Sequence, residues 1–404
     1  MNPRRMWPFL AATAMLATTA LPAEAIPAFA RKYNVSCNLC HSPAPRLNDF
    51  GEQFAANGFE FAPGELPRDT IDTGDELLRL LRRIDLAFRL DAYTTVSRPI
   101  GRDRTSMDLQ TPYNIKILSG GALARNISYY LYFFMTERGE VSGLEDAYIQ
   151  FTDIAGSGIS LIAGQFQVSD PLFKRELRLQ YEDYQPYRVR VGHVRADLTY
   201  DRGFLATYSP WDGGDLSLMA VNGHGLDEAG ADRLYNRDHF TNFAARFSQD
   251  LGMLRVGGFG YWGRERADDF SSRIVMWGPD ATIALRDNVE LNLQYVRRED
   301  TNPMLAADAL DTNVDAAFAE LIVGLGDTGR WWVTGLYNYI DADQPLLSMR
   351  VGEQDVGTGF MQRYHSASGG VHYLLHRNVR LMGEAGWDIE REEPRFTAGV
   401  TLAW

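Results

Sequence analysis

The chain has 404 residues, of which 45% are hydrophobic and 12% aromatic, and its formal net charge is −13. An acidic chain without a basic patch has nothing with which to neutralise phosphates, which argues against nucleic-acid binding. The apolar content is that of a folded protein and excludes an intrinsically disordered chain.

The first 25 residues predict a cleaved export signal. An arginine pair at positions 4 and 5 precedes an apolar run over residues 6–21, and Ala23-Glu24-Ala25 supplies the small residues of a cleavage site. The apolar run is too short for an uncleaved membrane anchor. We therefore expect residues 1–25 to be removed and the mature chain, starting at Ile26, to leave the cytoplasm.

Both cysteines of the chain lie in the stretch Cys37-Asn38-Leu39-Cys40-His41. A C-x-x-C-H pattern places two thiols to form thioethers with one haem, and the adjacent histidine to bind its iron. A redox pair would need a thioredoxin-like βαβ context, and zinc would need further ligands nearby. We predict one covalent c-type haem, with Cys37 and Cys40 as attachment sites and His41 as axial iron ligand. A lone thiol pair is the alternative.

Residues 26–83 form the predicted haem domain. Residues 26–33 read as a short helix, and residues 46–61 supply Leu47 and four phenylalanines as apolar surface around a porphyrin. A domain this small has little core of its own, so the haem would serve as much of it.

The predicted haem domain has no obvious sixth iron ligand, because no Met or His lies between Ser42 and Arg83. The iron would be five-coordinate or water-ligated, or a ligand would come from Tyr33, from the amine of Ile26 or from the rest of the chain. The choice matters because axial ligation sets the reduction potential.

From Ile84 to the C-terminus, apolar and polar residues alternate in segments of about ten residues, which is typical of a transmembrane β-barrel. Sixteen strands are expected, and the last one ends at the aromatic Trp404. Their predicted starts are Ile84, Asp108, Asn126, Leu144, Ile159, Gly203, Asp215, Phe240, Leu254, Arg273, Val289, Val314, Trp331, Gln362, Val379 and Arg395. A soluble β-sandwich also alternates, but the strand number, the short and long connections in turn and the terminal aromatic favour an all-β, porin-like antiparallel barrel over residues 84–404.

A barrel of sixteen strands encloses a lumen wide enough for water unless something fills it, and the haem domain is the expected plug. By strand parity, His372 and His376 face this lumen, where either histidine could complete the iron or serve as ordinary polar lining. Lumenal carboxylates would attract cations. These are Asp85, Asp91, Glu290, Glu384 and Asp388.

The stretch AIPAFARKYNVSCNLCHSPAPRL resembles the outer-membrane fused cytochrome-porins of iron-oxidising bacteria. The matching residues are Ala25, Pro27, Phe29, Ala30, Arg31, Cys37, Cys40, His41, Pro45 and Leu47. Members usually continue the Phe-Ala-Arg run with Gln-Thr, where this chain has Lys32 and Tyr33. The resemblance implies the same haem attachment, with Phe29 packed on the haem and Arg31 paired with a propionate.

The resemblance also implies a location and a function. A protein of this kind lies in the lipid of the Gram-negative outer membrane and passes electrons from extracellular Fe(II), through the haem, to a periplasmic carrier, so that it oxidises iron. Two rival functions are expected alongside it. One is an outer-membrane electron conduit for another donor or acceptor, and the other is a porin whose haem domain is structural or a gate.

Overall fold

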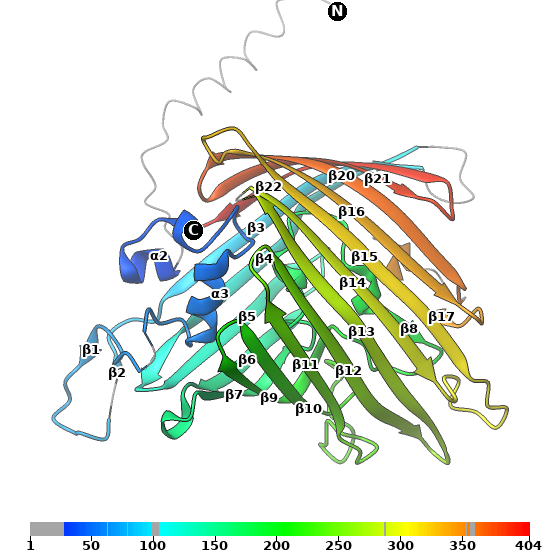
Figure 1. The fold of residues 1–404 in the computed structure, drawn as a ribbon, viewed down its shortest axis with the longest axis horizontal. Helices are drawn as coiled ribbons and strands as arrows, with labels where there is room; N and C mark the ends of the chain where they lie inside the picture. Colours follow the sequence, from blue (N-terminus) through cyan, green and yellow to red (C-terminus); the bar gives the residue numbers. More distant parts are fainter. Residues whose placement is uncertain are drawn as a thin grey trace, which may run out of the picture.

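Sixteen antiparallel strands form a closed barrel in the computed structural model (Figure 1). The structure describes residues 28–62, 64–78, 80–98, 105–286, 288–348, 350–351, 354–355 and 360–404. The predicted export signal and Ile26 lie outside these ranges. All sixteen strands begin within three residues of their predicted starts, so the barrel prediction is confirmed. No helix in the described ranges is long and apolar enough to cross a membrane.

Each barrel strand pairs with the next along the chain, and the last pairs with the first. The barrel strands are β3 (Leu86–Ser97), β4 (Ser106–Ala124), β5 (Ile127–Glu137), β6 (Gly143–Phe151), β7 (Ile159–Gln167), β9 (Tyr200–Trp211), β10 (Gly214–Val221), β11 (Asn242–Asp250), β12 (Leu254–Ala267), β13 (Phe270–Arg286), β14 (Val289–Asp300), β15 (Thr312–Leu325), β16 (Trp331–Ala342), β20 (Arg363–His376), β21 (Val379–Asp388) and β22 (Glu393–Ala403).

The remaining elements are short. They are α2 (Ala28–Tyr33), η2 (Cys37–Leu39), α3 (Asp49–Ala56), β1 (Thr70–Ile71), β2 (Leu80–Leu81), η3 (Ile154–Gly156), η4 (Arg175–Leu177), η5 (Gln185–Arg188), β8 (Arg190–Val191), β17 (Leu347–Ser348), β18 (Arg350–Val351) and β19 (Gln354–Asp355).

The barrel wall has an apolar outer face and a largely polar inner face. On β15, Glu320 and Ile322 are buried inside, whereas Leu321 between them points outward and is 41% exposed. Trp262 and Trp277 are exposed on the outside in the same way. Successive side chains of a strand point to opposite faces, so alternation along the chain becomes a lipid-facing outside and a lumenal inside.

The C-terminal residue closes the seam between the last strand and the first. Trp404 and Phe88 exchange two backbone hydrogen bonds, of 2.7 and 2.9 Å, and their rings stack with centroids 5.8 Å apart. The closure leaves β3 and β22 without an unpaired edge, which a wall in lipid requires.

The two ends of the barrel differ. At one end, called the short-turn end here, adjacent strands are joined by few residues, as at 125–126, 212–213, 251–253 and 377–378. The opposite end is called the long-loop end. Helices α2 and α3 lie at the short-turn end, on the same side as the C-terminus (Figure 1). The segment that carries the cysteines is therefore held at one mouth of the barrel.

Residues 168–199, which connect β7 to β9, fold into the barrel and are called the inner loop here. Tyr187 and Val191 are completely buried. The hydroxyl of Tyr184 donates to Glu320 over 2.8 Å, and that of Tyr187 donates to Gln294 over 2.9 Å. The inner loop has two short 3-10 turns and a strand, β8, that pairs with β17.

Arg298 of β14 ties the inner loop to the wall, and its replacement tests that role. Its guanidinium donates over 2.7 Å to the carbonyls of Val189 and Ala196, and forms a bidentate ion pair with Asp300. Arg298→Met leaves Asp300 buried without its partner, so we expect a loss of about 3–5 kcal/mol in stability. Thermal unfolding should shift down, and limited proteolysis should cut within residues 168–199. Arg297→Met, at the outward-facing neighbour, is the control, and equal effects of the two variants would contradict this role.

Candidate functional site

The two cysteines and His41 lie on one tight turn at the short-turn end of the barrel. The backbone amides of Cys40 and His41 both donate to the carbonyl of Cys37, over 3.2 and 3.0 Å. Both cysteines are free thiols, partly buried, and burial raises the pKa of each. The turn therefore presents two protonated thiols and an imidazole side by side.

The imidazole of His41 is oriented by two backbone carbonyls. Its Nδ1 lies 2.9 Å from the carbonyl oxygen of Pro45 and 3.2 Å from that of Arg46. A carbonyl only accepts, so Nδ1 carries the proton and Nε2 keeps its lone pair. Burial lowers the pKa of His41, and the two carbonyl contacts only partly oppose it. The ring is thus neutral, and Nε2 carries the lone pair.

Helix α3 packs directly against the cysteine turn. Its N-cap is Asn48, whose side-chain oxygen accepts from the amide of Gly51 over 2.9 Å. The amide of Asn48 donates to the carbonyl of Cys40. A Cβ on Gly51 would lie 2.2 Å from that carbonyl oxygen, so only glycine allows the helix to approach so closely.

An aromatic cluster packs α2, α3 and residues 59–61 against one another. Its members are Phe29, Tyr33, Phe50, Phe54, Phe59 and Phe61. Phe50, Phe61 and Leu39 of the turn itself remain 38–39% exposed, which leaves an apolar surface uncovered in a very small core. Two free thiols, a histidine with an unengaged Nε2 and this apolar surface fit a covalently attached haem.

The cysteine segment is docked across the barrel mouth. Arg46 forms an ion pair with Glu290 of β14, and Glu52 of α3 pairs with Lys174 of the inner loop. On the opposite wall, Phe59 stacks on Tyr130 of β5 with ring centroids 4.8 Å apart. Contacts to β5, to β14 and to the inner loop mean that residues 28–62 span the opening.

The structure places the other predicted site residues as follows. Phe29 stacks on Phe59 inside the aromatic cluster. Arg31 donates to the carbonyl of Leu86 at the start of β3 and so ties α2 to the barrel. The roles of these two residues toward a haem stay predictions.

The histidines considered as sixth ligand lie on β20. His372 is completely buried in the lumen wall, with Nε2 3.0 Å from the hydroxyl of Thr334 and no partner for Nδ1. His376 is exposed at the end of the strand. The hydroxyl of Tyr33 is engaged, because it donates to the carbonyl of Phe59 over 3.0 Å. Within the described ranges, no group of three or more His, Cys, Asp or Glu is placed to hold a metal ion.

The lumenal carboxylates do not form a free acidic lining, because each lies within ion-pair distance of an arginine. The pairs are Arg83–Asp85, Arg89–Asp91, Arg46–Glu290, Arg395–Glu384 and Arg391–Asp388. Pairing cancels most of the attraction that isolated carboxylates would exert on cations. The expected cation-attracting pore is therefore absent from this set of residues.

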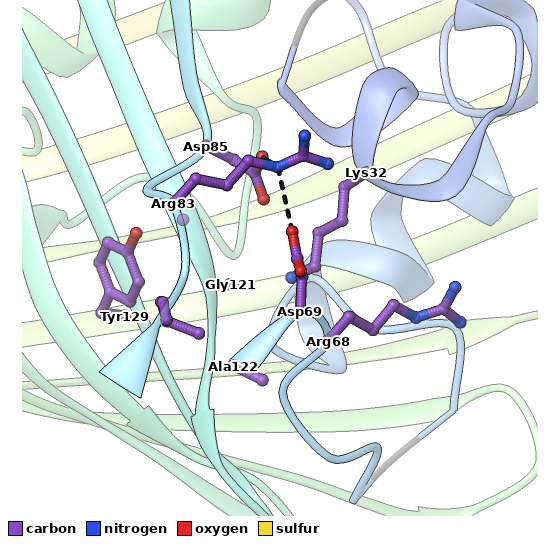
Figure 2. Close-up of a pocket in the computed structure, with 10 residues that line it drawn as sticks. Lys32, Arg68, Asp69, Arg83, Asp85, Gly121, Ala122 and Tyr129 are labelled. Carbon is purple, nitrogen blue, oxygen red and sulfur yellow. Dashed lines mark ion pairs between the residues drawn. The ribbon is translucent and has the colours of Figure 1, made fainter. Parts of the chain in front are cut away.

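A small polar cavity lies at the seam between α2, the β1–β2 hairpin and β4 (Figure 2). Its volume is about 70 Å³, and its charged lining includes Lys32, Asp69 and Arg83, with Arg83 and Asp69 paired over 3.6 Å. This space suits about two water molecules. The cavity does not include the cysteine turn, so it is part of the docking seam and not of the candidate site.

The barrel has the fold of outer-membrane porins. The chain is similar to a loop-deletion mutant of OmpT, an outer membrane protein of Vibrio cholerae, with TM-score 0.55, 12% identity and coverage of 79% of this chain and 99% of that one. It is also similar to OprB of Pseudomonas putida, with TM-score 0.52, 9% identity and coverage of 80% and 94%. No protein-family profile and no curated protein sequence matches the chain. At these identities the likeness shows the porin-like fold, as the sequence predicts.

Breaking the Arg46–Glu290 pair should loosen the cysteine segment without unfolding the barrel. Both side chains are more than three-quarters buried, so Arg46→Met leaves Glu290 uncompensated, and we expect docking to weaken by about 2–3 kcal/mol. Protease should then release residues 28–62 faster, and adding Glu290→Met should restore part of the protection. The control is Arg68→Met, because Arg68 is half exposed and pairs with Glu65, three positions away in the chain, and not with the barrel. Unchanged release from Arg46→Met would contradict the docking role.

Proposed function

We propose that this chain is an outer-membrane electron-transfer protein whose redox group is one c-type haem held by Cys37, Cys40 and His41. The proposed donor is extracellular Fe(II), which the chain would oxidise, and the proposed acceptor is a periplasmic electron carrier. Bound at this turn, a haem supplies a one-electron iron couple whose potential depends on its axial ligands.

The observation that carries the proposal is the state of His41. Its Nδ1 proton is fixed by the carbonyls of Pro45 and Arg46, which leaves Nε2 free to bind iron, next to two unpaired thiols. Hydrogen bonding at the far nitrogen of a ligating histidine also fixes the ring orientation and raises its basicity.

Aromatic contacts support a connection from this segment into the lumen. Phe59 stacks on Tyr130, the ring centroids of Tyr130 and Tyr132 are 6.4 Å apart, and those of Tyr132 and Phe134 are 5.5 Å apart. The ammonium of Lys116, which lines the large cavity inside the barrel, lies 5.3 Å from the ring centroid of Tyr132. The cysteine segment is thus in packed contact with a wall that leads towards the long-loop end.

A porin with a structural or gating haem domain is the second candidate. The likeness of the barrel to porins favours it more directly than it favours electron transfer. The position of residues 28–62 across the mouth would suit a gate.

Haem attachment is tested by replacing the thiols. We expect covalently bound haem in the wild type, detected by haem staining after denaturing electrophoresis, and none in the Cys37→Ala/Cys40→Ala double variant, because no thioether can form. His376→Ala, which removes a histidine outside the motif, should retain the stain. Covalent haem in the double variant would contradict the assignment.

Electron transfer is tested by mixing the oxidised, haem-loaded protein with Fe(II) in the absence of oxygen. The absorption bands should change to those of reduced haem, and an oxidant added afterwards should reverse the change. Bands that do not move would remove Fe(II) as the donor. Rapid entry of small sugars into liposomes that contain the haem-loaded protein would instead favour the porin.

A further inference from the structure

A large cavity lies inside the barrel, between the inner loop and the wall. Its volume is about 750 Å³, and its lining runs from Arg89 and Lys116 in the wall to Glu140 and Ser142 in the β5–β6 connection at the long-loop end. The cysteine turn does not contribute to it. The cavity is large enough for a small organic or inorganic molecule.

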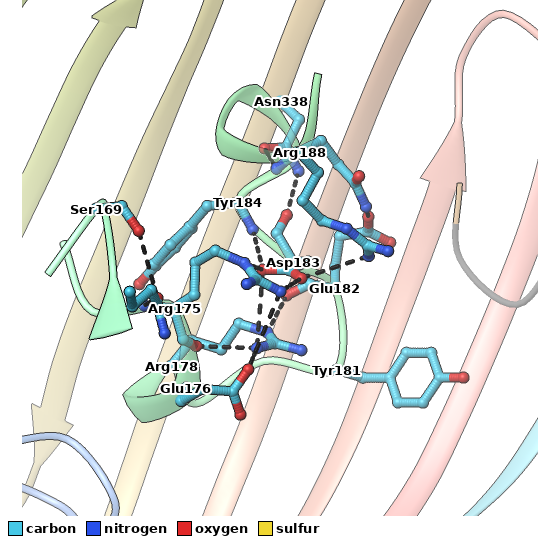
Figure 3. A network of polar contacts seen from close by, with 12 residues as sticks. Ser169, Arg175, Glu176, Arg178, Tyr181, Glu182, Asp183, Tyr184, Arg188 and Asn338 are labelled. Atoms are coloured by element: carbon cyan, nitrogen blue, oxygen red, sulfur yellow. Dashed lines mark hydrogen bonds and ion pairs between the residues drawn. The ribbon is translucent and has the colours of Figure 1, made fainter. Parts of the chain in front are cut away.

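Three arginines of the inner loop line one part of this cavity and are called the arginine cluster here (Figure 3). They are Arg175, Arg178 and Arg188. Three guanidinium groups converge on the carboxylate of Asp183, at 2.7 Å from Arg175, 3.7 Å from Arg178 and 3.4 Å from Arg188. Glu176 lies 4.0 Å from both Arg175 and Arg178, and its other oxygen is 2.8 Å from Lys116. Four cations thus share two carboxylates in direct contact.

The positive excess is local to the cluster. Over the whole cavity lining nine cationic side chains face eight carboxylates. Arg138 lies within electrostatic range of Arg188, and Glu137 lies within electrostatic range of Arg138. Burial lowers the pKa of Arg188, Asp183 opposes that, and Arg175, Arg138 and Arg178 lower it further. The neighbouring cations disfavour the charged form of this guanidinium, so an additional anion would stabilise it.

Arg178 and Arg188 are the members able to contact a ligand. Both line the cavity, with about a fifth of each side chain exposed, whereas Arg175 is almost completely buried. A guanidinium carries fixed pairs of N–H donors that match the oxygens of carboxylates and phosphates.

We propose that the arginine cluster binds a multivalent oxyanion, either a phosphate or a polycarboxylate, that enters the cavity from the long-loop end. This site is independent of the haem, because none of its residues touches the cysteine turn. Its failure would leave the electron-transfer proposal intact, and the reverse also holds.

The test is binding of two probes, inorganic pyrophosphate and citrate, to the full chain in detergent, measured by equilibrium dialysis. We expect saturable binding of at least one probe, weakened when NaCl is raised from about 0.05 to about 0.5 M. Arg188→Gln should weaken binding by about tenfold or more. Arg188→Lys should weaken it less, because lysine keeps the positive charge but lacks the paired N–H donors of a guanidinium. Binding of pyrophosphate alone identifies a phosphate ligand, binding of citrate alone a polycarboxylate, and binding of both a site that recognises charge and oxygen geometry.

Arg188 suits this test because its loss should not unfold the inner loop. Asp183 keeps Arg175 and Arg178 as partners, and Arg188 makes only the 3.4 Å contact with it. Arg255→Gln is the matched control, since Arg255 is an arginine paired with Asp215 outside the cavity lining. An Arg178→Gln variant should weaken binding of the probes as Arg188→Gln does. The proposal is overturned if neither probe binds the wild type saturably, or if folded Arg188→Gln binds both as the wild type does.

Discussion

The requirement that every backbone polar group in lipid has a partner determines this architecture. A sheet with an open edge cannot lie in the hydrocarbon of a membrane, so the sixteen strands must close on themselves. Closure depends on the pairing of β22 with β3, which Trp404 extends by two further hydrogen bonds to Phe88. Once the wall is closed, its alternation fixes a mainly apolar outside and a largely polar inner face that lines the lumen.

A lumen filled with charged side chains is stable only if the charges are paired, and the inner loop supplies many of the partners. Lys174 of the loop pairs with Glu52, Glu176 with Lys116 and Glu182 with Arg395. Each ion pair removes the cost of burying an isolated charge, so the loop and the wall stabilise one another. In the arginine cluster the cations outnumber the carboxylates they touch, which is the charge imbalance on which the proposed oxyanion site rests.

The sequence predicts the wall far better than the contents of the barrel. Strand starts follow from the alternation of apolar and polar residues, a local pattern, and so Val289 and Trp331 begin strands where expected. The partner of a charged side chain is not a local property. Arg46 and Glu290 are 244 positions apart, and the sequence offers no signal that joins them. For the same reason, the sequence predicts Glu290 and Asp91 as unpaired lumenal carboxylates, although the fold pairs each with an arginine. The sequence does not predict that the inner loop fills the lumen, because its buried residues Tyr184 and Val191 do not follow the alternation of a strand.

The cysteine segment depends on the barrel for its shape. Helix α2 has six residues and α3 eight, both too short to be stable in water without tertiary contacts. Those contacts are one aromatic cluster, the stacking of Phe59 on Tyr130 and the ion pairs of Arg46 and Glu52. The same short helices hold His41 with its Nδ1 on two carbonyls and its Nε2 free. The position of this nitrogen is therefore set by a segment that the barrel mouth holds in place. Glu290 is linked to His41 through Arg46, whose carbonyl contacts Nδ1. Lys174 is linked to the cysteine turn through Glu52 of α3, the helix whose Gly51 packs against the carbonyl of Cys40.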